Sequence, residues 1–260
     1  MDNNFLWLNR PLALERSFVA NLARNISAGK IAFKEDKTRT TGLEVYDDIA
    51  VIKVQGALIP GNISCGLMTG YDFIRQKLSE AINNSQIRKI VLLIDSPGGV
   101  ASGCLDLSDT IYKLRGEKLI VAIVDDCAYS AAYAIASAAD IITVSRAGGI
   151  GSIGVIAMHT DITEMLDNMG VKITTITYGK YKAERAETTP LSDGAKERMQ
   201  ADVNQIGEWF VELVARNRKL SPQKIRDLEA STFLGSDGVA NGLADFVLPP
   251  DQAFLITQSY

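Results

Sequence analysis

The stretch of sequence that decides the fold is IVLLIDSPGGVASGCLDLSDTIYKL, residues 90–114. Its first five residues form a continuous apolar run, which is typical of a strand buried on both faces of a parallel sheet. Gly98 and Gly99 follow closely, and residues 101–114 are predicted to form a helix. A buried strand that passes through a tight glycine turn into a helix is the repeating unit of α/β proteins.

The same alternation continues on both sides of this stretch. Towards the N-terminus, residues 49–58 are rich in β-branched residues, and residues 71–83 carry apolar residues at helical spacing. Towards the C-terminus the sequence predicts strands at 119–124, 141–144, 155–158 and 171–178, and helices at 130–138, 162–169 and 191–220. Repeated units of this kind predict an α/β fold with a largely parallel sheet.

The chain divides into three parts by composition. Residues 48–248 are expected to form one compact domain, because turns are evenly spaced throughout them. Residues 1–47 are predicted to form an N-terminal helix, at about 5–30, followed by the polar linker KEDKTRTTG. Residues 249–260 are interpreted as a C-terminal tail.

Composition excludes several classes of protein. Lys and Arg total 27 against 31 Asp and Glu, a formal charge of −4, and the isoelectric point of about 5.2 argues against nucleic-acid binding. The three cysteines form no CxxC pair and there is one histidine, His159, so a metal site is not expected. No cofactor is expected either. The first residues lack the pattern of a signal peptide and no apolar run suits a membrane span, so we expect a cytoplasmic protein without membrane contact.

Three motifs carry residues that could do chemistry. The turn around Gly99 presents backbone N–H groups near a helix start, which suits an anion or an oxyanion, although an ordinary tight turn has the same sequence. Ser130 lies at a predicted helix start, where serine is either a nucleophile or an N-cap. Lys180 and Lys182 follow a predicted strand and are either surface residues or, if buried, a general base.

Together, the motifs IDSPGG, AYSAAY, GGIGSIGV and GKYKAE resemble, in this order, the serine peptidases related to signal peptide peptidase A. That family belongs to the Clp protease and crotonase superfamily. The resemblance covers about residues 48–248, including a matching closing segment at 232–245. It implies an α/β fold of repeated strand-strand-helix units with a largely parallel sheet, and a serine-type endopeptidase.

The resemblance also implies a role for five residues. Ser130 matches the nucleophile and Lys182 the general base of a Ser-Lys dyad, while Ser152 matches the serine that orients the lysine. The oxyanion hole matches the backbone N–H groups of Gly99 and Ala131. A lysine base fits a chain with a single histidine.

Two features of the sequence depart from this pattern or fall outside it. The family pattern after the nucleophile is Gly-Gly, whereas this chain has Ala131-Ala132, and the added methyl groups narrow the approach to the serine. His159 is expected to be a bystander.

Within the family, the short N-terminal extension and the YKAE–TPLS run resemble the capsid assembly, or head maturation, proteases of tailed phages. This branch implies cleavage of scaffold and other head proteins inside an assembling procapsid, in a bacterial host cell. The resemblance to the superfamily also implies a homo-oligomer. The alternatives are a cytoplasmic peptidase of signal peptides or oligopeptides, a crotonase-like acyl-CoA enzyme, and a catalytically silent procapsid subunit.

Overall fold

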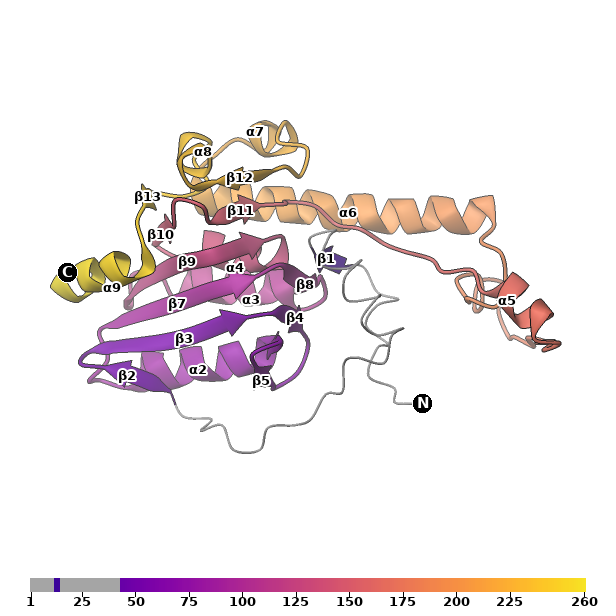
Figure 1. Ribbon diagram of the computed structural model, residues 1–260, viewed down its shortest axis with the longest axis horizontal. Coiled ribbons are helices and arrows are strands. Elements are labelled where there is room, and N and C mark those ends of the chain that lie inside the picture. The colour runs from indigo at the N-terminus through magenta and orange to yellow at the C-terminus, as the bar shows by residue number, and fades with distance from the viewer. Residues whose placement is uncertain (1–11, 15–42) are drawn as a thin grey trace.

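The computed structural model describes residues 12–14 and 43–260 (Figure 1). Its larger sheet is built on three long parallel strands, β3 (Ile49–Gln55), β7 (Lys89–Ser96) and β9 (Leu119–Tyr129). Ile49, Ile52, Ile90 and Leu92 are among the largest fully buried side chains, as expected of strands covered on both faces. The predicted α/β fold with a largely parallel sheet is confirmed.

The remaining strands of this sheet flank the long ones. The sheet order is β12-β11-β9-β7-β3-β2, and β10 and β13 extend it beside the first half of β9. These strands are β2 (Glu44–Tyr46), β10 (Ile141–Val144), β11 (Gly149–Gly151), β12 (Thr232–Leu234) and β13 (Phe246–Val247). Because β10 pairs with the first half of β9, the second half of β9 is left to pair with β11.

A smaller sheet lies at the carboxyl ends of the long strands, in the order β1-β8-β4-β6-β5. Its strands are β1 (Leu12–Leu14), β4 (Ala57–Ile59), β5 (Ser64–Cys65), β6 (Met68–Gly70) and β8 (Gly98–Val100). The chain passes from β3 into β4 at Gly56 and from β7 into β8 at Pro97. Gly56 has a φ of 65°, a conformation that favours glycine.

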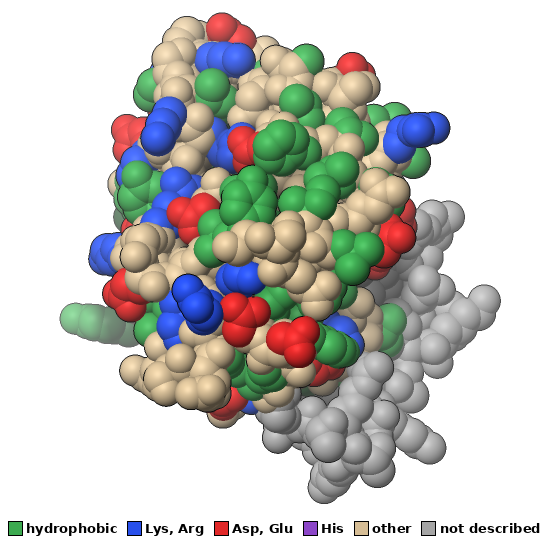
Figure 2. Space-filling model, turned by 90° about the vertical axis from the view of Figure 1, so that its left-hand side faces the viewer, with side chains coloured by type: hydrophobic (Ala, Val, Ile, Leu, Met, Phe, Trp, Pro, Cys, Tyr) green, Lys and Arg blue, Asp and Glu red, His purple; other side chains and the backbone are tan. Residues whose placement is uncertain are grey.

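Helices cover both faces of the larger sheet (Figure 1). On one face lie α2 (Tyr71–Asn83), α3 (Cys104–Lys113), α4 (Ala131–Ser137) and the long α6 (Asp193–Arg218). The other face is covered by α9 (Pro250–Ser259), in the region interpreted as a tail, whose Ala253 packs against Ile49, Val91 and Val121. Figure 2 shows hydrophobic side chains gathered on the side where α9 and β13 lie; Phe246 and Leu255 are more than half exposed there.

One part of the chain projects from this body. Residues 155–192, which we call the arm, run out beside α6, form α5 (Thr163–Asn168) at its far end, and return to the start of α6 (Figure 1). The short helices α7 (Pro222–Arg226) and α8 (Gly235–Ala240) follow α6 and flank β12.

The structure corrects several predicted elements. The part of the predicted helix at 5–30 that is described, Leu12–Leu14, is a strand; the remainder of that helix and the linker at 34–42 lie outside the described residues. The predicted strands at 155–158 and 171–178 do not form, apart from one isolated bridge residue at Ile156. A strand needs a neighbour to satisfy its backbone, and in the arm Ile176 is 92% exposed.

Candidate active site

Ser130 joins β9 to α4 in a backbone conformation that is unusual for serine. Its φ is 53° and its ψ is −117°, which is sparsely populated by residues with a side chain. The surrounding structure holds it there, since its N–H donates to the Gly151 carbonyl at 2.8 Å and its Oγ donates to the Gly154 carbonyl at 3.3 Å. Ser130 is 1% exposed. Such strain is concentrated at functional positions, so an ordinary N-cap does not account for this serine, whose side chain makes no cap hydrogen bond.

Ala131 begins α4 immediately after Ser130. The first N–H groups of a helix have no intrahelical acceptor and point towards the positive end of its dipole. Ala131 and Ala132 are fully buried, so their methyl groups pack in the core of the domain. The N–H of Ala131 is the first of these groups in α4 and directly follows Ser130 in the chain.

Gly99 lies at the centre of β8, and this strand contacts α4. A Cβ at Gly99 would lie 1.8 Å from the carbonyl oxygen of Leu58 on β4, so only glycine fits this pairing. On the other side, β8 pairs with β1 in an antiparallel register that sets Ala13 opposite Gly99. The strand β8, which carries the predicted oxyanion donor, therefore lies between β4 on one side and β1 on the other.

Ser152 follows β11, the strand that pairs with the end of β9 in a register that sets Gly151 opposite Tyr129. Its φ of 54° is again unusual, and its N–H donates to the carbonyl of Ser231 at 2.9 Å. The pairing of β11 with β9 brings Ser152 to the same end of the sheet as Ser130.

Lys182 is not brought to that end of the sheet. It is exposed on the arm, which is fastened to the first turns of α6 by an ion pair between Glu184 and Arg198. Arg198 also lies 4.2 Å from the ring centroid of Tyr181. The helix α4 packs instead at the other end of α6, where Asn217 donates to the Ser137 hydroxyl. Arg198 and Asn217 are separated by about 28 Å along the helix axis, at about 1.5 Å per residue.

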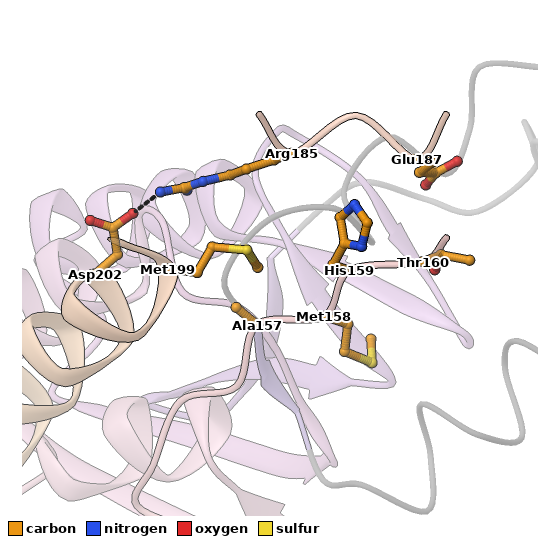
Figure 3. Close-up of a pocket in the computed structure, with 8 residues that line it drawn as sticks. All are labelled: Ala157, Met158, His159, Thr160, Arg185, Glu187, Met199 and Asp202. Carbon is orange, nitrogen blue, oxygen red and sulfur yellow. Dashed lines mark hydrogen bonds and ion pairs between the residues drawn. The ribbon is translucent and has the colours of Figure 1, made fainter. Parts of the chain in front are cut away.

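His159 also belongs to the arm. It lines a cavity of about 40 Å³ together with Arg185, Glu187, Met199 and Asp202, among others, and its Nε2 lies 3.2 Å from the Ala186 carbonyl (Figure 3). Arg185 and Asp202 form an ion pair of 2.8 Å across one side of this cavity. The cavity has room for very few water molecules, and none of its lining residues belongs to β8, β9 or α4.

The two cysteines near Ser130 are unsuited to nucleophilic attack. Burial raises the pKa of Cys104 to about 12, and burial together with Asp95 raises the pKa of Cys127 to about 12. The Cys127 thiol donates to the Asp95 carboxylate at 3.7 Å. Burial, and then Asp126, raise the pKa of Asp95. At neutral pH both thiols stay protonated, so neither cysteine is a ready nucleophile.

Residues 12–14 and 43–260 contain neither a membrane-spanning helix nor a metal-binding cluster. No helix in this part of the chain is both long and apolar enough to cross a membrane. Nor do His, Cys, Asp and Glu side chains gather there in a group of three or more that could hold a metal ion.

Sequence patterns did not reveal every residue that shapes this site. The Ser96 hydroxyl accepts from the N–H of Gly98, and the Tyr71 hydroxyl donates to the Val100 carbonyl. In the sequence Ser96 stands only within a turn motif, and Tyr71 only as the first residue of the predicted helix at 71–83. Their contacts cross from one element to another, which spacing along a chain does not report.

The chain resembles known proteins in sequence and in fold. The family model described as Peptidase family S49 matches residues 113–257, more than half of the chain. The head-tail preconnector protein GP5 of Enterobacteria phage P21 is 37% identical over 95% of this chain and 55% of its own length. Capsid assembly protease C of Escherichia phage lambda is 31% identical over 82% of this chain and 49% of its own length. The chain thus spans about half the length of these curated relatives.

Among solved structures, a mutant of the 1510-N membrane-bound stomatin-specific protease has a TM-score of 0.54 to this chain. The match covers 82% of this chain and 84% of the other, at 12% identity. At that identity the likeness concerns the fold alone. The expected family resemblance, including its phage branch, is confirmed by these comparisons.

Proposed function

Because the chain belongs to peptidase family S49, we propose that it is a serine endopeptidase with a Ser-Lys dyad. Ser130 is the nucleophile, Lys182 the general base, and Ser152 the residue that orients the lysine. The N–H groups of Gly99 and Ala131 form the oxyanion hole. The observation that carries this proposal is the strained Ser130 at the start of α4, beside the glycine strand β8.

The reaction follows from these groups. The neutral amine of Lys182 takes the proton from the Ser130 hydroxyl, and Oγ attacks the carbonyl carbon of the scissile peptide. The N–H groups of Gly99 and Ala131 stabilise the negative oxygen, at about 2.7–4 kcal/mol for one such donor. The protonated lysine then gives its proton to the leaving amine, and water hydrolyses the acyl-enzyme by the same steps.

In this proposal the dyad is completed between copies of the chain. Lys182 lies on the arm, away from its own Ser130, and a lysine becomes an effective base only when it is desolvated. The arm carries apolar side chains without cover in the single chain: Ile176 is 92% exposed and Tyr178 fully so. A homo-oligomer in which the arm of one copy packs over the Ser130 of the next buries both the apolar side chains and the lysine.

Mixing two inactive variants tests this assembly. Ser130→Ala and Lys182→Ala are each expected to be inactive, whereas a mixture of the two regains part of the activity, because some sites combine an intact serine with an intact lysine. A mixture that stays inactive, while each variant forms wild-type oligomers on a sizing column, argues against sharing of the dyad between copies.

The proposed substrates are scaffold and other head proteins, cleaved inside an assembling procapsid in the bacterial cytoplasm. The support is the name of one relative, capsid assembly protease C of phage lambda, and a second phage relative named as a head-tail preconnector protein. The alternative functions would give other products from a scaffold protein. These alternatives are a peptidase of signal peptides or oligopeptides, a crotonase-like enzyme and a catalytically silent structural subunit.

Mass spectrometry of a scaffold protein after incubation with the chain separates these functions. We expect fragments with the wild type and with Ser108→Ala, a control that removes another buried serine hydroxyl. Ser130→Ala should give none. Cleavage of short peptides but not of the scaffold protein supports the oligopeptide function, and identical fragments from wild type and Ser130→Ala contradict the dyad.

A further inference from the structure

The three residues of β8 are held at both ends by buried hydroxyl groups. We propose that Ser96 and Tyr71 are positioning residues that fix β8 so that the Gly99 N–H points at the oxyanion. This inference rests on the proposed function, since it concerns the same oxyanion hole. Neither hydroxyl touches the reacting atoms; both act through the backbone of β8.

Ser96 controls the turn that leads into β8. It is the last residue of β7 and is fully buried. Its Oγ donates to the carbonyl of Gly56 at 2.7 Å and accepts from the N–H of Gly98 at 3.1 Å. Gly98 has a φ of 102° and, as a glycine, can rotate freely about its backbone bonds. The two hydrogen bonds of Ser96 remove that freedom, and with it the freedom of the next peptide, which carries the Gly99 N–H.

Tyr71 holds the other end of the strand. Its Oη donates to the Val100 carbonyl at 2.6 Å, and the side chain is 1% exposed. Burial raises the pKa of Tyr71 well above its ordinary value, so the hydroxyl remains a donor throughout the working range of pH. Gly103 leaves room for the ring, since a Cβ there would lie 3.3 Å from it.

Tyr71 is also connected, through Cys104, to Ala131, which supplies the second oxyanion donor. Cys104 lies against Tyr71, and its thiol donates to the carbonyl of Ala131 at 3.4 Å. The buried Tyr71 and Cys104 therefore connect the end of β8 to the first residue of α4. The spacing between the N–H groups of Gly99 and Ala131 depends on this connection.

A strand of three residues needs such anchors. On the side of β4, β8 is paired through one position, Leu58 opposite Gly99. An error of about 1 Å in placing a reacting group can lower the rate about 10²-fold. Removal of either hydroxyl is therefore expected to reduce kcat at least about tenfold and to leave KM unchanged, because an oxyanion donor acts on the transition state.

The test compares Ser96→Ala and Tyr71→Phe with matched controls. Ser108→Ala removes a buried serine hydroxyl that donates to the Ala134 carbonyl, and Tyr133→Phe removes a buried tyrosine hydroxyl that donates to the Leu243 carbonyl. For each variant we measure kcat and KM on a peptide that the wild type cleaves, the rate at which a fluorophosphonate labels Ser130, and the Tm.

We expect all four variants to lose a similar amount of Tm, while only Ser96→Ala and Tyr71→Phe lose kcat and labelling rate. The proposal is overturned if these two keep the kcat of their controls, or if the controls lose as much. Should Tyr71→Phe not fold, Ser96→Ala decides alone. A wild type that is not labelled at Ser130 overturns the proposed function itself, and this inference with it, so the two failures are distinguishable.

Discussion

Replacing Gly99 by alanine is the sharpest perturbation of the proposed oxyanion hole. A Cβ at this position lies 1.8 Å from the Leu58 carbonyl oxygen, and contacts of a Cβ below 3.0 Å are essentially never found. The strand β8 must therefore retreat from β4 by about 1.2 Å. A shift of that size takes the Gly99 N–H out of hydrogen-bonding distance of a correctly placed oxyanion.

The expected loss is that of one oxyanion donor, about 10²–10³-fold in kcat or about 2.7–4 kcal/mol. KM should change little, because the donor acts mainly in the transition state. The assay is steady-state cleavage of a peptide, with a circular dichroism melt to confirm folding.

Gly207→Ala is the matched control. Gly207 lies within α6 and has open space where a Cβ would stand, so the same substitution should leave kcat unchanged and stabilise the helix by about 0.5–1 kcal/mol. A folded Gly99→Ala variant whose kcat stays within about tenfold of wild type would refute the assignment of Gly99 as a donor.

Four further perturbations give distinct results. Lys182→Ala should lower kcat at least about 10³-fold, whereas His159→Ala should retain kcat within about threefold; the reverse order in a peptide assay contradicts the lysine base. Asp95→Asn should raise the Tm at pH 7, because burial and Asp126 raise the pKa of this carboxyl and so disfavour its ionised form in the folded state. The gain should vanish as the pH falls and the wild-type carboxyl becomes protonated, and a gain that grows in acid contradicts the sign. Removal of residues 1–14 should lower KM for a peptide substrate several-fold with kcat unchanged, because β1 lies on the edge of β8 beside Gly99; an unchanged KM means that substrate does not use this edge.

Local patterns predicted much of the body of the domain. The helix at 71–83 and the strand at 141–144 form with the predicted bounds. The helix packs in the core of the same chain, and the strand pairs with β9 and β13. The run at 90–94 is the centre of β7, where Ile90, Leu92 and Ile94 are fully buried. In these elements most of the apolar residues of the sequence are buried in the structure.

The arm shows where such patterns fail. Residues 171–178 are rich in β-branched residues, which favour a strand, yet Ile173 and Ile176 are exposed and no strand forms. Such composition leads to a strand only where another strand is present to pair with it, and within residues 12–14 and 43–260 no strand pairs with the arm. The glycine-rich segment at 148–154 contains β11, which pairs with the end of β9, and Gly149 leaves room for the Tyr129 side chain.

The candidate site shows the same limit. Ser130 and Ser152 lie at the same end of the sheet because β11 pairs with the end of β9, and Gly99 lies on β8, the strand that contacts α4. The spacing between Ser130 and Lys182 carries no information on whether the two meet within one copy or between two. The hydroxyls of Ser96 and Tyr71 contact backbone on other elements, which no single-sequence pattern encodes.

The nucleophile is the central claim, and a covalent probe tests it most directly. The chain is treated with a fluorophosphonate, digested, and searched by mass spectrometry for the modified residue. We predict one adduct, on Ser130, that is absent in Ser130→Ala and present in Ser108→Ala. An adduct on another serine, or an equal adduct in Ser130→Ala, would contradict the account.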